Sequence, residues 1–167
     1  MTHDGSAGGA APILVPVDFS AASEAAVLHA VSLAAKLDAP LCILHVVHDP
    51  AHAPGSYQAE NHDRVVRNLE DIARGMLDAF IERVRESHPE AAPLRSAESR
   101  LVVGLPVTRI MEVVEQIGAG QVVMGSSGRT GIAHLLVGSK AEQTVRLCPV
   151  PVTIVKAPDD AEEAKKT

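Results

Sequence analysis

Short, mostly apolar runs alternate along this chain with longer stretches of helical periodicity, and this alternation most limits the folds open to it. The runs have the length and composition of strands, and they cover residues 13–17, 41–47, 99–103, 121–124 and 150–155. Strands that are apolar on both faces are typical of a parallel sheet with helices on each side. The sequence therefore predicts a single α/β domain over residues 11–156.

The stretches between the runs predict helices. Ala-rich 21–37 follows Ser20, a good N-cap residue. A longer helix is predicted from apolar residues three or four positions apart, which form one face for the core: Val65, Leu69, Ile72, Met76, Phe80 and Val84. A third helix follows Pro106, which suits a first turn, and ends at Gly118 and Gly120. The last helix is expected to begin at Ser139.

Other segments predict connections and ends. Residues 48–61 hold Pro50, Pro54 and Gly55 and are expected to form a loop. Pro151 cannot donate a hydrogen bond to a neighbouring strand, which favours a sheet edge for the last strand. An edge strand is open to pairing with a second copy of the chain. Residues 1–10 and 157–167 are expected to be flexible tails.

Composition excludes several classes of function. With 167 residues, of which 46% are apolar, the chain can bury a core of its own. Its net charge of −6 disfavours binding to duplex nucleic acid or to anionic membranes, and only 2% aromatic residues disfavour base stacking on single strands. No apolar run is long enough to span a membrane. Met1–Ala10 lacks a signal-peptide pattern, so we expect a cytoplasmic protein whose Cys42 and Cys148 stay reduced.

A glycine-rich segment carries most of the functional information. Gly125-x2-Gly128-x9-Gly138-Ser139 follows a predicted strand and leads into the last helix. Glycines allow a ligand close to the backbone, and the first turn of a helix attracts anions. The pattern therefore predicts a phosphate site, although turn glycines are the commoner case. Ser139 and Glu142 also match a capping box, in which the serine would cap its own helix.

Polar residues at other strand ends extend this hypothesis. If the first and fourth strands are neighbours, Asp18, Val46 and the glycine loop surround one crevice at the carboxyl edge of the sheet. Asp18 would hold a ribose hydroxyl or a phosphate-bound cation, or it would only orient the turn that follows. Arg129 and Lys140 would neutralise phosphate charge, or they would be ordinary solvated charges.

Other chemistry is weakly indicated. His45, His48 and His52 with Asp49 resemble metal ligands only superficially, because their spacing implies no fixed geometry. We therefore assign no metal site. The chain contains no Walker-type phosphate loop and no G-x-S-x-G elbow, and we assign no catalytic residue.

The motifs together resemble the universal stress protein family. The resemblance rests on the glycine pattern, on residues 13–20 and 44–46, on Gly104-Leu105-Pro106 and on residues 149–155, in that order along the chain. It implies a Rossmann-like fold, similar to the adenine nucleotide alpha hydrolases, with a five-stranded parallel sheet in the order 3-2-1-4-5. It also implies a homodimer that forms through the last strand, at residues 150–155.

The complete glycine pattern is that of the ATP-binding branch of the family. By resemblance, Pro16, Val17 and Asp18 would line the adenosine side, and Val46 would meet the adenine. The ribose and phosphates would be surrounded by Met124, Gly125, Ser127, Gly128, Gly138, Ser139 and Lys140. Ser127 stands where a histidine is frequent in the family, Lys140 where a small apolar residue is common, and Gln121 where an acidic residue is often found.

The hypothesis that follows is an ATP-binding regulatory stress protein. The expected ligand is ATP, alone or with Mg²⁺, and AMP or cyclic AMP remains an alternative. A bound nucleotide would order the loop 126–137 and present it to a regulatory protein partner. A slow ATP hydrolase is the enzymatic alternative, in which Asp18, Arg129, Lys140 and Ser127 would supply the needed groups.

Overall fold

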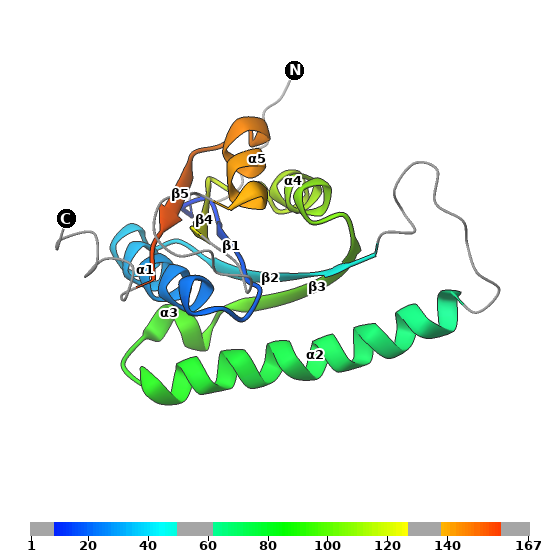
Figure 1. The fold of residues 1–167 in the computed structure, drawn as a ribbon. Helices are drawn as coiled ribbons and strands as arrows, with labels where there is room; N and C mark the ends of the chain where they lie inside the picture. The colour runs from blue at the N-terminus through cyan, green and yellow to red at the C-terminus, as the bar shows by residue number, and fades with distance from the viewer. Residues whose placement is uncertain (1–8, 50–61, 127–137, 158–167) are drawn as a thin grey trace, which may run out of the picture.

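Strands and helices alternate through the computed structural model, which describes residues 9–49, 62–126 and 138–157 (Figure 1). The expected tails at 1–8 and 158–167, the loop at 50–61 and the glycine segment 127–137 lie outside these residues. The elements are β1 (Ile13–Pro16), α1 (Ala21–Leu37), β2 (Leu41–His48), α2 (His62–Ser87), α3 (Ala92–Arg95), β3 (Glu98–Gly104), α4 (Pro106–Ile117), β4 (Gln121–Gly125), α5 (Ser139–Leu147) and β5 (Val152–Val155).

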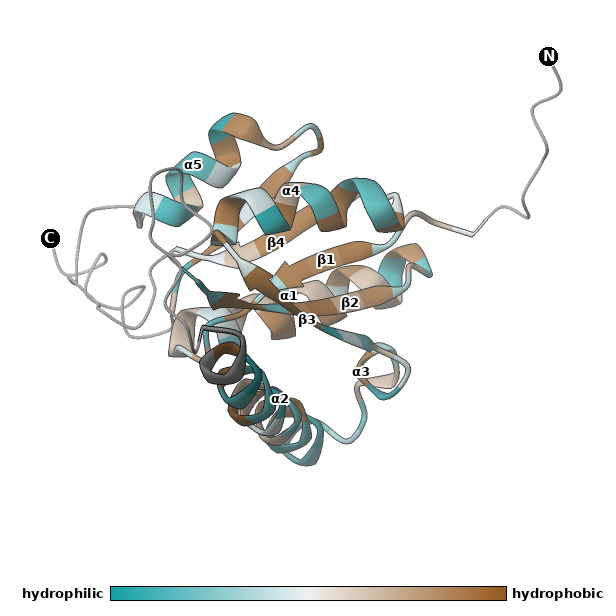
Figure 2. Ribbon diagram, turned by 90° about the vertical axis from the view of Figure 1, so that its right-hand side faces the viewer, coloured by the Kyte–Doolittle hydropathy of each residue, from teal (hydrophilic) through white to brown (hydrophobic). Residues whose placement is uncertain are grey.

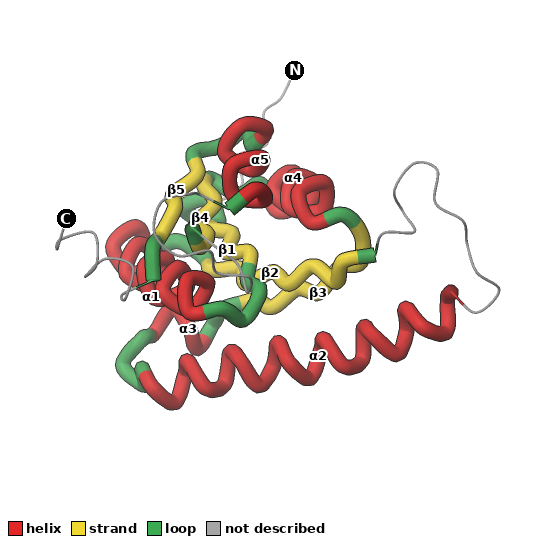
Figure 3. The backbone as a smooth tube through the Cα atoms, viewed as in Figure 1, coloured by secondary structure: helices red, strands yellow, loops and turns green. Residues whose placement is uncertain are grey.

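The strands form one sheet in the order β3-β2-β1-β4-β5, and each neighbouring pair is parallel. Helices α1, α2 and α3 lie on one side of the sheet, and α4 and α5 lie on the other (Figure 3). The predicted α/β fold and strand order are confirmed. The covering of both faces explains why successive residues of the central strands are apolar, since successive side chains point to opposite sides.

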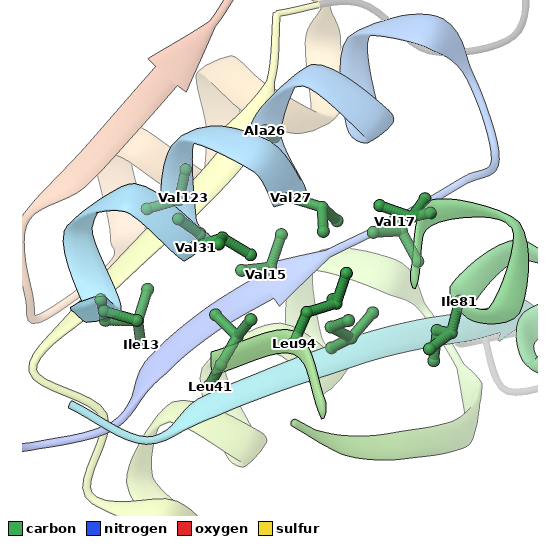
Figure 4. Close-up of a cluster of buried hydrophobic side chains, with 14 of the residues drawn as sticks. Ile13, Val15, Val17, Ala26, Val27, Val31, Leu41, Ile81, Leu94 and Val123 are labelled. Carbon is green, nitrogen blue, oxygen red and sulfur yellow. The ribbon is translucent and has the colours of Figure 1, made fainter. Parts of the chain in front are cut away.

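Each face of the sheet has its own core. Ile13 and Val15 of β1 are buried together with Val27 of α1 and Leu77 and Phe80 of α2, and Figure 4 shows part of this cluster. On the opposite face, Leu14 of β1 is buried against helix α4, and the brown strands in Figure 2 are enclosed between the helices. Burial of each such side chain contributes roughly 1.5–3 kcal/mol relative to exposure, so the position of β1 at the centre of the sheet is strongly determined.

Several predicted helix ends are confirmed. Ser20 caps α1, because its side-chain oxygen accepts a hydrogen bond from the backbone N–H of Ser23 at 3.2 Å. Pro106 is the first residue of α4, and Gly118 ends that helix with a left-handed φ of 62°. Glycine suits this place because other residues adopt a positive φ only at a cost.

The prediction that one continuous face of α2 packs into the core is wrong for part of that face. Phe80 and Val84 are buried, but Leu69, Ile72 and Met76 are 45%, 62% and 40% exposed. Twenty-six residues of helix span about 39 Å, whereas the eight residues of β2 span only about 26 Å. Helix α2 is therefore longer than the strand that it covers.

Two further details differ from the sequence-based expectation. The short helix α3 occupies Ala92–Arg95, where the sequence analysis predicts no helix. Strand β5 begins at Val152, so Pro151 lies just before it and accepts a hydrogen bond from the N–H of Val122 at 2.9 Å. The expected edge position of β5 is nevertheless confirmed.

Candidate functional site

A cavity of about 540 Å³ opens at the carboxyl ends of β1, β2 and β4. Strand β1 lies between β2 and β4, so the connections that follow β1 and β4 leave the sheet on opposite faces. Such a reversal of strand order is where open α/β sheets bind ligands. The first turn of α5, the first turns of α4 and the middle of α2 complete the walls.

The structure brings together every described residue that the sequence analysis assigned to a nucleotide site. These residues all line the cavity: Pro16, Val17, Asp18, Val46, Met124, Gly125, Gly138, Ser139 and Lys140. Ser127 and Gly128 lie outside the described residues, as does Arg129. The assignment itself, that these residues bind a nucleotide, stays a proposal, because it concerns a ligand and not only their positions.

One end of the cavity is formed by the start of α5. Gly138 is the N-cap residue, and a glycine has no side chain with which to form a capping hydrogen bond. The predicted capping box of Ser139 and Glu142 is therefore wrong: Ser139 is the first residue inside the helix, and Glu142 pairs with Arg146 at 2.9 Å. Ser139 and Lys140 are exposed. Amides in the first turn of a helix have no partner within the helix, and the positive end of the helix dipole attracts anions.

The two ends of the glycine segment are fastened next to each other. The backbone N–H of Gly138 donates to the carbonyl of Ser126 at 2.7 Å, and the N–H of Ser126 donates to the carbonyl of Val155 at 2.8 Å. Gly125 has a packing reason to be glycine. A Cβ at this position would lie 2.8 Å from the carbonyl carbon of Ala22 and 2.9 Å from the nitrogen of Ser23.

Asp18 orients the turn between β1 and α1. Its Oδ1 accepts hydrogen bonds from the backbone N–H of Ser20 at 3.2 Å and from the Ser20 hydroxyl at 2.6 Å. The structural role that the sequence left open is therefore present. The carboxylate is only partly buried and also lines the cavity, so this role and contact with a ligand are compatible.

Sequence reasoning missed the apolar wall of the cavity. Leu69, Ile72 and Met76 of α2 line it, together with Ile110 of α4 and with His45, which lies one position before Val46. The apolar periodicity of α2 was the available signal, but it was interpreted as core. The length of the helix relative to the strands was the feature that could have corrected this interpretation.

In residues 9–49, 62–126 and 138–157 no three metal-ligating side chains gather, and His52 lies outside these ranges. No helix in the described part of the chain is long and apolar enough to cross a membrane.

The pKa of the Cys42 thiol is raised to about 11, chiefly because the thiol is buried. The nearby Glu98 carboxylate also raises this pKa, and Arg100 lowers it. This thiol is therefore protonated and unreactive at neutral pH.

The fold and cavity define an open parallel α/β domain with a cavity at the point where the strand order of its sheet reverses. The chain belongs to the universal stress protein family, because its residues 10–156 match the sequence pattern of that family. It is 28% identical over 146 residues to Universal stress protein MJ0531 of Methanocaldococcus jannaschii, an alignment that covers 87% of this chain and 82% of that protein. The chain spans about half the length of the mycobacterial relatives that it matches, of which it covers 48%.

Solved structures show the same architecture. The universal stress protein UspA from Lactobacillus plantarum superposes with a TM-score of 0.70 at 27% identity, over 89% of this chain and 99% of that one. A universal stress protein crystallised in complex with cAMP superposes with a TM-score of 0.63 at 25% identity, over 88% of this chain and 97% of that one.

Proposed function

We propose that this protein is an ATP-binding regulatory module of the cytoplasm, with the nucleotide in the cavity at the carboxyl ends of β1, β2 and β4. The observation that carries the proposal is the convergence of the nine predicted residues on one cavity of about 540 Å³. The cAMP complex of a relative supports an adenine nucleotide as the ligand class. A reducing compartment suits Cys42 and Cys148, which form no disulfide.

The cavity lining offers both kinds of surface that a nucleotide requires. Leu69, Ile72, Met76 and Ile110 offer apolar surface to a base. The first-turn amides of α5, with Ser139 and Lys140, would receive phosphate oxygens. Asp18 lies where β1 ends, and it would meet the ribose or a Mg²⁺ ion bound to the phosphates. A protein partner would then respond to occupancy of this edge of the sheet.

The proposal is tested by isothermal titration of nucleotide-stripped protein. ATP is titrated with and without Mg²⁺, alongside AMP and cyclic AMP, and GTP serves as the control for base recognition. We expect saturable ATP binding near one site per chain and no comparable binding of GTP. Binding of AMP or cyclic AMP without ATP would replace the ligand, and binding of no adenine nucleotide would contradict the proposal. Phosphate release over many turnovers in the same samples would favour the hydrolase alternative.

We further propose that the protein forms a homodimer through residues 150–155. Strand β5 is the outer strand next to β4, and each of its residues is only partly buried in the isolated chain. A second copy of the strand would satisfy its unpaired backbone edge. Light scattering over micromolar concentrations is expected to give the mass of two chains, and a constant monomer mass would exclude this dimer.

A further inference from the structure

The turn that carries Asp18 has an unusual backbone. Phe19, the next residue, has a left-handed φ of 66°. A bulky side chain seldom adopts this conformation, and it persists only where surrounding contacts hold it. The contacts that hold Phe19 therefore also determine where the Asp18 carboxylate lies.

His45 of β2 contacts the residues on both sides of Asp18. Its Nδ1 lies 2.8 Å from the carbonyl oxygen of Val17, and its ring stacks on Phe19 with centroids 4.3 Å apart and an angle of 30° between the planes. Because a carbonyl oxygen can only accept, Nδ1 must carry the hydrogen. The bond fixes the tautomer of the ring, and it also survives protonation, since imidazolium keeps this N–H.

Helix α2 supports the same turn from the other side. The ring of Phe80 lies 5.6 Å from that of Phe19, and the guanidinium of Arg83 lies 5.3 Å above the Phe80 ring. Arg83 also forms an ion pair at 2.9 Å with Glu24 in the first turn of α1. Of the side chains His45, Phe80 and Arg83, only His45 also lines the cavity, so it joins the turn to the ligand space.

We infer that His45 is a positioning residue of the nucleotide site, which holds Asp18 in place through the Val17 carbonyl and the Phe19 ring. This inference rests on the proposed function for its ligand but not for its geometry. A site whose turn is already ordered pays less conformational entropy when it binds. Loss of the His45 hydrogen bond is therefore expected to weaken nucleotide binding without contact between His45 and the phosphates.

The test compares three variants by ATP titration. His45→Leu removes the donor, and its Kd is expected to rise about fivefold, which is typical of one lost hydrogen bond. His45→Asn places an amide N–H near the position of Nδ1 and is expected to recover most of the affinity. His88→Leu is the matched control, because His88 Nδ1 lies 3.3 Å from the Val84 carbonyl in α2, outside the cavity lining, and its Kd should stay that of the wild type.

Three results would overturn the inference: wild-type affinity in His45→Leu, an equal loss in His45→Asn, or an equal loss in His88→Leu. A second measurement needs neither a variant nor a ligand. Long-range ¹H–¹⁵N spectra of the wild-type histidines are expected to show hydrogen on Nδ1 of His45, and a neutral ring with hydrogen on Nε2 would contradict the inference. If wild-type protein bound no nucleotide, the proposed function would fail, while this spectrum would still decide the geometry.

Discussion

Replacing Gly125 with alanine is expected to lower the free energy of unfolding by about 3 kcal/mol, the upper part of the range for overpacked sites. The added Cβ would lie 2.8 Å from the carbonyl carbon of Ala22 and 2.9 Å from the Ser23 nitrogen. These are backbone atoms of the first turn of α1, which is anchored by its Ser20 cap. No side-chain rotation can relieve the contact, so the strand and the helix must separate.

Urea denaturation of the wild type and of Gly125→Ala measures this loss in the free energy of unfolding. Gly75→Ala is the control, because nothing lies within 4 Å of a Cβ at Gly75. It replaces a glycine inside α2 and is expected to stabilise the protein by up to about 1 kcal/mol. Opposite signs for the two substitutions would show that close packing, not glycine content, sets the requirement at Gly125. An unfolding midpoint for Gly125→Ala equal to that of the wild type would refute this account.

Reversing the charge of Lys140 is expected to separate binding from stability. Lys140 is an exposed residue in the first turn of α5 and lines the cavity. A glutamate there would interact favourably with the positive end of the helix dipole, so Lys140→Glu should unfold at the same temperature as the wild type or slightly higher. The same glutamate would repel phosphates, and we expect the Kd for ATP to rise at least about tenfold at low salt.

The effect of Lys140→Glu on affinity can be checked by changing the charge of the nucleotide and the salt concentration. The loss of affinity should be smaller for AMP than for ATP, and it should shrink as salt is raised. Lys36→Glu makes the same change in net charge in the last turn of α1, at a residue that does not line the cavity, and it should leave ATP affinity unchanged. Equal losses in both variants would indicate a general charge effect and would argue against phosphates beside Lys140.

Much of the fold could be predicted because its signals are local. Ser20 and Gly118 mark helix ends through interactions with their own neighbours in sequence, and the apolar strands indicate a sheet buried on both faces. The capping box at Ser139 failed for a local reason as well. The helix begins one residue earlier than the motif requires, and the serine is therefore inside it.

The candidate site was predictable only in part. Strand ends and glycines marked residues that line the cavity, since parallel strands bring their carboxyl ends to one edge. The apolar wall from α2 was not recognisable, because a helical face looks the same whether it packs on a sheet or extends beyond it. Ile72 and Phe80 belong to the same periodic pattern, yet they are 62% and 2% exposed.

The sequence by itself therefore determined the class of fold, several helix ends and the family, because these depend on periodicity and on contacts between near neighbours. Tertiary structure alone decided that Gly125 must be glycine, since the reason is the backbone of α1 more than a hundred positions earlier in the chain. It also decided that His45 holds both neighbours of Asp18. Such contacts exist only after β1, β2 and β4 pair, because pairing brings distant segments within a few ångströms.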